Sequence, residues 1–148
     1  MKVLMVCLGN ICRSPLAHGI LANSAPKHWL IDSAGTSGWH EGERPDTRSI
    51  LTAKSHDILI EDQRSRKFIV DDFDTYDVIF AMDSSNFSSL TALAPNKASV
   101  GKIRLIMNEA YTDENRQVPD PYTGGQQGFE QVYQMLHHAI HCFLERNS

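Results

Sequence analysis

The chain passes from its first predicted strand into its first predicted helix through Cys7-Leu8-Gly9-Asn10-Ile11-Cys12-Arg13-Ser14-Pro15. An apolar run over residues 3–6 precedes this stretch and is typical of a buried strand, and a helical pattern follows over residues 15–23. A tight loop between a strand and a helix N-terminus attracts anions, because backbone N–H groups converge there and the helix dipole adds positive potential. We therefore expect a phosphate-binding loop directly after the first strand.

The loop carries a thiol at one end and a guanidinium at the other. A helix N-terminus and a nearby cation lower the pKa of a cysteine thiol to about 3.5–7.5, so Cys7 is expected to be a thiolate nucleophile. Arg13 can donate two parallel hydrogen bonds to phosphate oxygens, which a lysine cannot do. We expect Ser14 to cap the helix ahead of Pro15 and to donate its hydroxyl to the thiolate.

Other interpretations of the loop explain less of it. Cys7 as a small buried hydrophobe and Arg13 as a solvated residue would leave Gly9-Asn10, which tolerate positive φ, without a purpose. A nucleotide-binding loop needs Gly-Lys followed by Ser or Thr, which is missing here. A disulfide-exchange motif has two residues between its cysteines, whereas Cys7 and Cys12 are separated by four.

Asp120 is the second candidate catalytic residue. It lies between Pro119 and Pro121, which stiffen the chain, and Tyr122 follows. A carboxylic acid on a loop over the phosphate site can protonate a leaving oxygen. Pro-Asp-Pro is also good chemistry for a simple surface turn, so the local sequence leaves both interpretations open.

Further segments along the chain extend this pattern: Ser33-Ala34-Gly35-Thr36, Trp39-His40, Pro45-Asp46-Thr47-Arg48, Ala81-Met82-Asp83 and Asp120-Pro121-Tyr122. With the stretch from Val6 to Pro15, they make the chain resemble the low-molecular-weight protein tyrosine phosphatases. One departure is His18, where bacterial members of that family often carry Glu, and we expect it to affect surface chemistry and not catalysis.

The resemblance implies one phosphatase domain over residues 1–148 that hydrolyses phosphotyrosine in proteins through a cysteinyl-phosphate. Cys7 would be the nucleophile, Arg13 the phosphate clamp, and Asp120 the general acid and then the base. Eight residues would bind the substrate: Leu8, Gly9, Asn10, Ile11, Cys12, Ser14, Trp39 and Tyr122. The expected partners are a tyrosine-phosphorylated protein and inorganic phosphate, which is both product and competitive ligand. No metal or other cofactor is expected, because Arg13 and the loop amides supply the positive charge.

Three alternatives remain open. Arsenate reduction on the same fold needs further cysteines to relay a disulfide, and residues 80–95 contain none. Protein-arginine phosphatases resemble this chain but carry Thr at the position of Ile11. A non-catalytic phosphate-binding module would be expected to lack Cys7 or Asp120, and both are present.

Composition limits the class of protein. A formal net charge of −4 argues against nucleic acid as a partner. Three cysteines, an odd number, argue for a reducing compartment, which we expect to be the cytoplasm. We expect neither a secretory signal peptide nor a membrane span, since no apolar run approaches about 20 residues.

Apolar periodicity predicts alternating strands and helices. The expected strands cover 3–6, 29–34, 76–81 and 102–105, and the expected helices cover 15–23, 46–54, 65–70, 84–93 and 126–145. The closing helix should bury one face, formed by Phe129, Val132, Tyr133, Leu136, Ile140 and Phe143. The order predicts an α/β fold, a doubly wound four-stranded parallel sheet with helices on both faces, and a ligand crevice at the carboxyl ends of its strands.

Four smaller expectations concern single side chains. Asp83 either orients the loop or caps the next helix, and we favour the cap. His137 and His141 have a spacing that can bind metal, but with His138 they fit a solvated helix face better. Cys142 is expected to be half-buried. Cys12 either packs against the first helix or captures an oxidised Cys7 as a disulfide, and the two roles are compatible.

Overall fold

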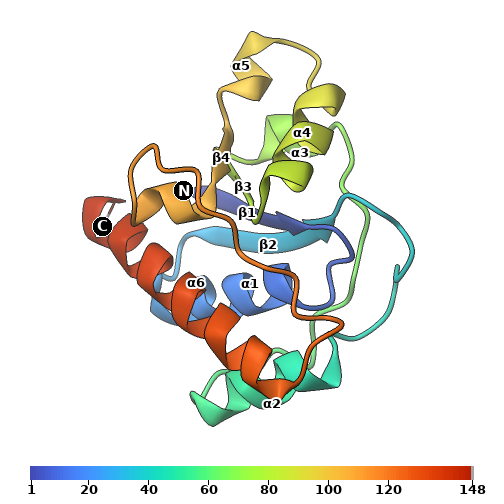
Figure 1. Ribbon diagram of the computed structural model, residues 1–148. Helices are drawn as coiled ribbons and strands as arrows, with labels where there is room; N and C mark the ends of the chain where they lie inside the picture. Colours follow the sequence, from blue (N-terminus) through green and yellow to red (C-terminus); the bar gives the residue numbers. More distant parts are fainter. Residues whose placement is uncertain (148) are drawn as a thin grey trace.

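The computed structural model describes residues 1–147 of the chain. Four parallel strands form one sheet in the order β2-β1-β3-β4, with helices on both of its faces (Figure 1). The strands are β1 (Lys2–Cys7), β2 (Leu30–Gly35), β3 (Val78–Ala81) and β4 (Ile103–Leu105). The predicted α/β fold with a doubly wound, four-stranded parallel sheet is confirmed.

Helices cover the two faces unequally. On one face lie α1 (Arg13–Ser24), α2 (Thr47–Ser55) and α6 (Gln126–Asn147), with the 3-10 helix η1 (Ile106–Glu109) packed against α6. The other face carries α3 (Asp72–Thr75) and α4 (Ser84–Leu93), and the short α5 (Lys97–Val100) follows α4. Because β1 lies between β2 and β3, its carboxyl end contacts the segments that follow these two neighbouring strands.

The strand β1 contributes to both hydrophobic clusters of the protein. Val3, Met5 and Cys7 pack toward α1 and α6, whereas Leu4 and Val6 pack toward α3 and α4. Burial on both faces explains why this strand is apolar throughout. The predicted apolar face of α6 is confirmed, since all six of its members are buried.

One predicted helix is wrong. Residues 65–70 form no helix, and the helix in this region, α3, begins only at Asp72. The backbone of Arg66 and Phe68 instead bonds to both sides of Gly35, at 2.8 Å each, so this segment runs along the end of β2. Pairing with a strand that is distant in sequence therefore outweighs the local helical pattern.

The other predicted elements agree with the structure to within a few residues, and α5 and η1 were not expected. The start of α1 differs in one detail. Its N-cap is Cys12 and not Ser14, so Pro15 is the third residue of the helix. Within residues 1–147, no helix has the length and apolar character that a membrane span requires.

Candidate active site

The loop between β1 and α1 has its carbonyl groups turned outward. Those of Cys7 and Leu8 accept from the backbone N–H groups of Thr36 and Ser37, each at 2.9 Å. Three further carbonyls of the loop continue the pattern, since Gly9 accepts from Ser65, Ile11 from the backbone of Asp46, and Cys12 from Ser49. Because the C=O and N–H of a trans peptide point in opposite directions, the amides of this loop face its interior and can hold an anion there.

Asn10 holds the loop from beneath. Its φ is +55°, which asparagine tolerates better than most residues. Its side-chain amide donates to Ser14 at 2.8 Å and to Ser33 at 3.0 Å, and its oxygen accepts the backbone N–H of Arg66 at 3.0 Å. Asn10 therefore shapes the loop through its side-chain hydrogen bonds.

The Cys7 sulfur lies at the bottom of the loop, 3.0 Å from the hydroxyl oxygen of Ser14. Both residues are buried. Because the Ser14 oxygen accepts from Asn10, its own proton is available for the sulfur. The contact between Cys7 and Ser14 is therefore suited to a thiolate.

Arg13 begins α1 and is 2% exposed. One of its terminal nitrogens donates to Asp83 at 2.6 Å and to the carbonyl oxygen of Val118 at 3.0 Å, and the other lies 3.8 Å from a carboxylate oxygen of Asp120. Burial opposes its charge, but Cys7 and the bond to Asp83 outweigh burial and raise the pKa of Arg13. The guanidinium is thus held charged between Asp83 and Asp120.

Asp83 therefore has both of the roles considered for it. One carboxylate oxygen accepts the backbone N–H of Asn86 at 2.8 Å and caps α4, as favoured from the sequence. The other binds Arg13, a contact that the sequence left as the second choice.

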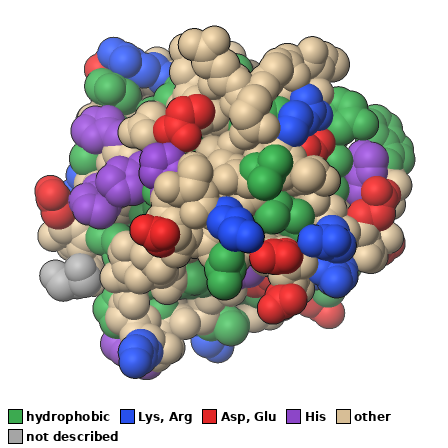
Figure 2. All heavy atoms as spheres, turned by 90° about the horizontal axis from the view of Figure 1, so that it is seen from below, with side chains coloured by type: hydrophobic (Ala, Val, Ile, Leu, Met, Phe, Trp, Pro, Cys, Tyr) green, Lys and Arg blue, Asp and Glu red, His purple; other side chains and the backbone are tan. Residues whose placement is uncertain are grey.

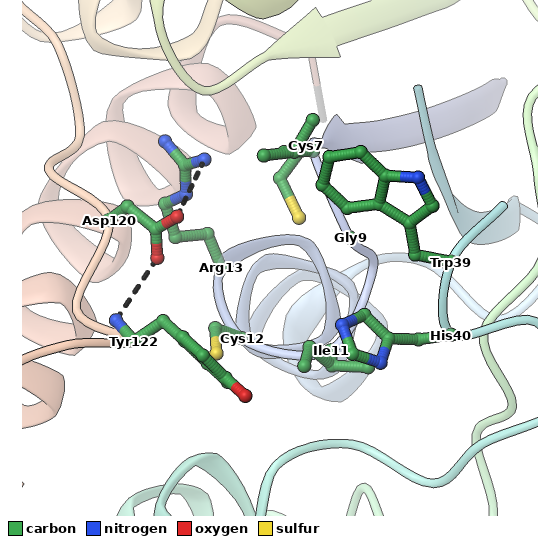
Figure 3. Close-up of a pocket in the computed structure, with 10 residues that line it drawn as sticks. Cys7, Gly9, Ile11, Cys12, Arg13, Trp39, His40, Asp120 and Tyr122 are labelled. Atoms are coloured by element: carbon green, nitrogen blue, oxygen red, sulfur yellow. Dashed lines mark hydrogen bonds and ion pairs between the residues drawn. The ribbon is translucent and has the colours of Figure 1, made fainter. Parts of the chain in front are cut away.

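A cavity of about 150 Å³ opens above the loop (Figure 3). Ten residues line it: Cys7, Leu8, Gly9, Ile11, Cys12, Arg13, Trp39, His40, Asp120 and Tyr122. Of the eleven residues predicted for the site, Asn10 and Ser14 lie beneath the loop and do not line the cavity. His40 was not predicted, although its neighbour Trp39 was. Its ring packs against Gly9, where an added Cβ would lie 3.2 Å from the imidazole.

The walls of this cavity are partly open to solvent. Trp39 is 75% exposed and Tyr122 is 49% exposed, whereas Ile11 is buried. Asp120 faces the cavity between Pro119 and Pro121, with 46% of its side chain exposed, and one of its oxygens accepts the backbone N–H of Tyr122. The arrangement places an anion site and a sulfur atom at the floor, a carboxyl at the rim and apolar side chains around them.

The other two cysteines differ from Cys7. Burial raises the pKa of Cys12 well above its ordinary value, and Asp46 and Cys7 add to the rise, so Cys12 stays a thiol at neutral pH. Cys142 is half-buried on α6, as expected.

Three histidines lie on α6 and one, His18, lies on α1. His138 and His141 are exposed on α6 and His137 is half-buried, and Figure 2 shows histidine side chains gathered on the face that α6 and α2 cover. Among residues 1–147, no group of three or more His, Cys, Asp or Glu side chains is placed to hold a metal ion. His18 was expected at the surface but is half-buried, with a ring nitrogen 3.4 Å from the hydroxyl oxygen of Ser33.

The chain is similar to known proteins along nearly its whole length. The family described as low molecular weight phosphotyrosine protein phosphatase matches residues 2–147. A low molecular weight phosphotyrosine protein phosphatase of Schizosaccharomyces pombe is 41% identical over 150 aligned positions, which cover 97% of this chain and 95% of the relative. The crystal structure of a protein tyrosine phosphatase from Entamoeba histolytica superposes with a TM-score of 0.91 at 36% identity, covering 99% of this chain and 96% of that one. An arginine phosphatase of Drosophila superposes with a TM-score of 0.90 at 33% identity and covers 100% and 99%.

Proposed function

Because this chain belongs to the low molecular weight phosphotyrosine protein phosphatase family and is a phosphatase, we propose that it hydrolyses phosphotyrosine in proteins through a cysteinyl-phosphate. In this proposal Cys7 is the nucleophile, Arg13 holds the phosphate, and Asp120 is the general acid and then the base. The domain that carries the activity spans residues 1–148.

The observation that carries the proposal is the position of the Cys7 sulfur inside a ring of inward-facing amides, 3.0 Å from Ser14. A phosphate bound to those amides and to Arg13 would present its phosphorus to the sulfur. Charge on the equatorial oxygens is the main feature of a loose phosphoryl-transfer transition state, and fixed donors stabilise it.

The reaction has two steps. In the first, the Cys7 thiolate forms a bond to phosphorus while the bond to the tyrosine oxygen breaks, and Asp120 gives that oxygen its proton. In the second, Asp120 takes a proton from water, the water oxygen bonds to phosphorus, and the sulfur–phosphorus bond breaks to regenerate the thiolate. Inorganic phosphate is released and competes with substrate for the same amides. This chemistry calls for no cofactor, since Arg13 and the loop supply the positive charge.

Two substitutions test the roles. Cys7→Ser removes the thiolate but leaves the amides and Arg13, so turnover of phenyl phosphate should vanish while phosphate binding by calorimetry persists. Asp120→Asn should lower kcat/KM for phenyl phosphate by about 10²–10⁴-fold, and much less for dinitrophenyl phosphate, whose leaving group needs no proton. Residual turnover by Cys7→Ser, or an equal loss on both esters by Asp120→Asn, contradicts the assigned roles.

The cavity supports phosphotyrosine as the substrate. A phosphotyrosine ring can reach the floor and bury its faces against Leu8, Ile11, Trp39 and Tyr122, at about 25 cal/mol per Å² of apolar surface. A phosphoserine stem is shorter and has no ring.

A similar structure belongs to an arginine phosphatase, so phosphoarginine is the substrate to compare. The buried Ile11 offers methyl groups where arginine-directed relatives offer a hydroxyl that can activate water or hydrogen-bond a guanidinium. We expect kcat/KM on matched peptides to favour phosphotyrosine over both phosphoserine and phosphoarginine, and Ile11→Thr to shift activity toward phosphoarginine. Equal or better activity of the unmutated protein on phosphoarginine overturns the tyrosine assignment.

The proposal includes redox sensitivity and a reducing, cytoplasmic location. Peroxide oxidises an accessible thiolate to a sulfenic acid, and Cys12 can then displace water from it to form a disulfide. Inactivation by mild peroxide should be reversed by dithiothreitol, and in Cys12→Ser further peroxide should carry a larger share of Cys7 from the sulfenic acid to the sulfinic and sulfonic acids, which dithiothreitol does not reduce. Peptide mapping that finds Cys7 as sulfonic acid in the unmutated protein, with no Cys7–Cys12 linkage, rejects this protection.

A further inference from the structure

Arg48, near the start of α2, binds the chain that follows Asp120. Its two terminal nitrogens donate to the carbonyl oxygens of Tyr122, at 2.9 Å, and Gly124, at 2.8 Å. These acceptors come two and four residues after Asp120. Arg48 therefore ties down the segment on which the carboxyl is mounted, 72 residues away from it in sequence.

Arg48 is itself held rigidly. One carboxylate oxygen of Asp46 accepts from its backbone N–H and from Nε, and the other accepts from a terminal nitrogen at 3.0 Å. These bonds hold the pKa of Asp46 below its ordinary value, so the pair stays ionised at neutral pH. The guanidinium also stacks over the buried ring of Phe129, 4.5 Å from its centroid.

The same pair is bonded to the phosphate loop. The backbone N–H of Asp46 donates to the carbonyl oxygen of Ile11 at 2.8 Å, and Phe129 packs against Ile11 and Cys12. A continuous set of contacts therefore runs from the phosphate loop through Asp46 and Arg48 to Tyr122 and Gly124.

The other end of the segment is held by Arg13. Val118 donates its N–H to Met82 at 2.9 Å and accepts from Arg13 at 3.0 Å. Between Val118 and Tyr122 the two prolines restrict the backbone, and the carboxyl of Asp120 is 46% exposed. The direction in which Asp120 points is thus set at the two ends of a stiff segment, one at Arg13 and one at Arg48.

We propose that Arg48 is the positioning residue for the general acid: by binding the carbonyls of Tyr122 and Gly124 it holds the Asp120 carboxyl over the leaving oxygen. This inference rests on the function proposed above. Arg48 acts only through Asp120, so its loss should matter in proportion to how much the leaving group needs a proton. A displacement of about 1 Å in a catalytic group can cost about 10²-fold in rate.

The test compares kcat/KM for phenyl phosphate, whose phenol has a tyrosine-like pKa of about 10, with that for dinitrophenyl phosphate. Arg48→Met keeps the side-chain stem and removes the donors. It should lose about 10–100-fold on phenyl phosphate and stay within about threefold on the dinitrophenyl ester. Arg48→Lys should lose less than Arg48→Met, because its ammonium can keep one of the two carbonyl contacts although it cannot bind both.

The matched control is Arg146→Met. Arg146 also binds a backbone carbonyl and a carboxylate, both of Glu109, but lies at the end of α6. It should leave both esters unchanged, and thermal unfolding of all variants reports whether they fold. If Arg48→Met does not fold, Arg48→Lys carries the comparison.

A double-mutant cycle separates positioning from a general structural effect. In the Asp120→Asn background, Arg48→Met should cost less than about twofold further, because the group that it positions is already absent. An equal loss on both esters, or the full loss retained beside Asp120→Asn, overturns the role of Arg48. If Asp120→Asn alone shows no leaving-group dependence, the proposed general acid fails as well. If it shows that dependence and Arg48→Met does not, only the present inference fails.

Discussion

At the scale of single residues, Asn10 shows how one side chain can serve both a backbone conformation and a hydrogen-bond network. Its φ of +55° turns the loop inward, and its amide fills three hydrogen bonds with Ser14, Ser33 and the backbone of Arg66. Few residue types satisfy both demands, since most carry a cost of about 1–2 kcal/mol in the left-handed region.

Asn10→Gly and Asn10→Ala should separate these two contributions. Both remove the buried hydrogen bonds, which should lower the free energy of unfolding by about 1–3 kcal/mol. Asn10→Ala should be about 0.5–1 kcal/mol less stable than Asn10→Gly, because the left-handed cost of alanine exceeds the extra chain entropy of glycine. Urea unfolding measures both, and an alanine variant as stable as the glycine variant would show that φ is not constrained here.

Asp83→Asn tests the half-buried carboxylate partner of Arg13. Asparagine can still cap α4, but its amide nitrogen then replaces the oxygen that accepts from Arg13, so the substitution removes both the charge and that hydrogen bond. Leaving the buried guanidinium without its carboxylate should lower the free energy of unfolding by about 3 kcal/mol. We expect the low end of the range for buried pairs, because 20% of the Asp83 side chain is exposed.

The control for Asp83→Asn is Asp62→Asn, which removes an exposed carboxylate and should change stability by no more than about 0.5 kcal/mol. Saturating phosphate should raise the unfolding midpoint of the Asp83 variant, since a bound anion gives Arg13 a new counter-charge. Similar stability of the two asparagine variants argues against a structural role for the Arg13–Asp83 pair.

At the scale of elements, the packing of α1 depends on its close approach to residues 58–60, which follow α2. The helix carries Gly19 at the point of contact, where an added Cβ would lie 2.5 Å from a methyl of Ile60 and 3.1 Å from one of Ile58. Glycine disfavours a helix interior by about 1 kcal/mol, so its presence here reflects packing and not propensity.

Gly19→Ala should therefore destabilise the protein, because overpacking costs about 1–3 kcal/mol and exceeds the propensity gain. Gly128→Ala in α6 is the matched control, since its added Cβ would meet only Pro121, at an ordinary 3.7 Å. The control should be neutral or stabilising by up to about 1 kcal/mol. Thermal unfolding of the two variants compares them, and stabilisation by both would mean that the contact with Ile60 relaxes freely.

At the scale of the whole molecule, burial of titratable groups makes stability depend on pH. Burial lowers the pKa of His18, with Asp32 opposing the shift, and burial also lowers the pKa of His137. The lowered pKa values of Asp46 and Glu130 favour stability above the ordinary carboxyl range, and that contribution is lost only below about pH 4.5. The window between pH 7 and pH 5 is therefore governed by histidines.

The sign for His18 follows from its two states. Above about pH 6.5 it is neutral in both, and below that the unfolded chain binds the proton more readily than the folded one. The free energy of unfolding should thus fall between pH 7 and pH 5, by about 1.4 kcal/mol for each unit of difference between the two pKa values. His18→Gln should flatten this slope, whereas His28→Gln, at an exposed position, should not. A slope unchanged by His18→Gln places its origin elsewhere.

Sequence patterns that span only a few residues were sufficient to predict much of the fold of this protein. The strand–loop–helix around Cys7, the apolar face of α6 and the alternation of strands and helices depend on hydrogen bonds and periodicities that span only a few residues. The sequence therefore determined the sheet class and the strand–loop–helix that carries Cys7. It also predicted eleven site residues, partly through family resemblance, and nine of them line the cavity.

Contacts between distant segments were decided only by the tertiary structure. The carboxylate partner of Arg13 lies 70 residues away at Asp83, the carbonyl partners of Arg48 lie 74 and 76 residues away, and residues 66–68 are not helical because they pair with Gly35. No local pattern encodes such pairings, because they arise only when the sheet brings the carboxyl ends of its strands to one edge. The physical reason is that side-chain propensities act over a few residues, whereas the orientation of a catalytic group depends on which parts of the chain fold beside it.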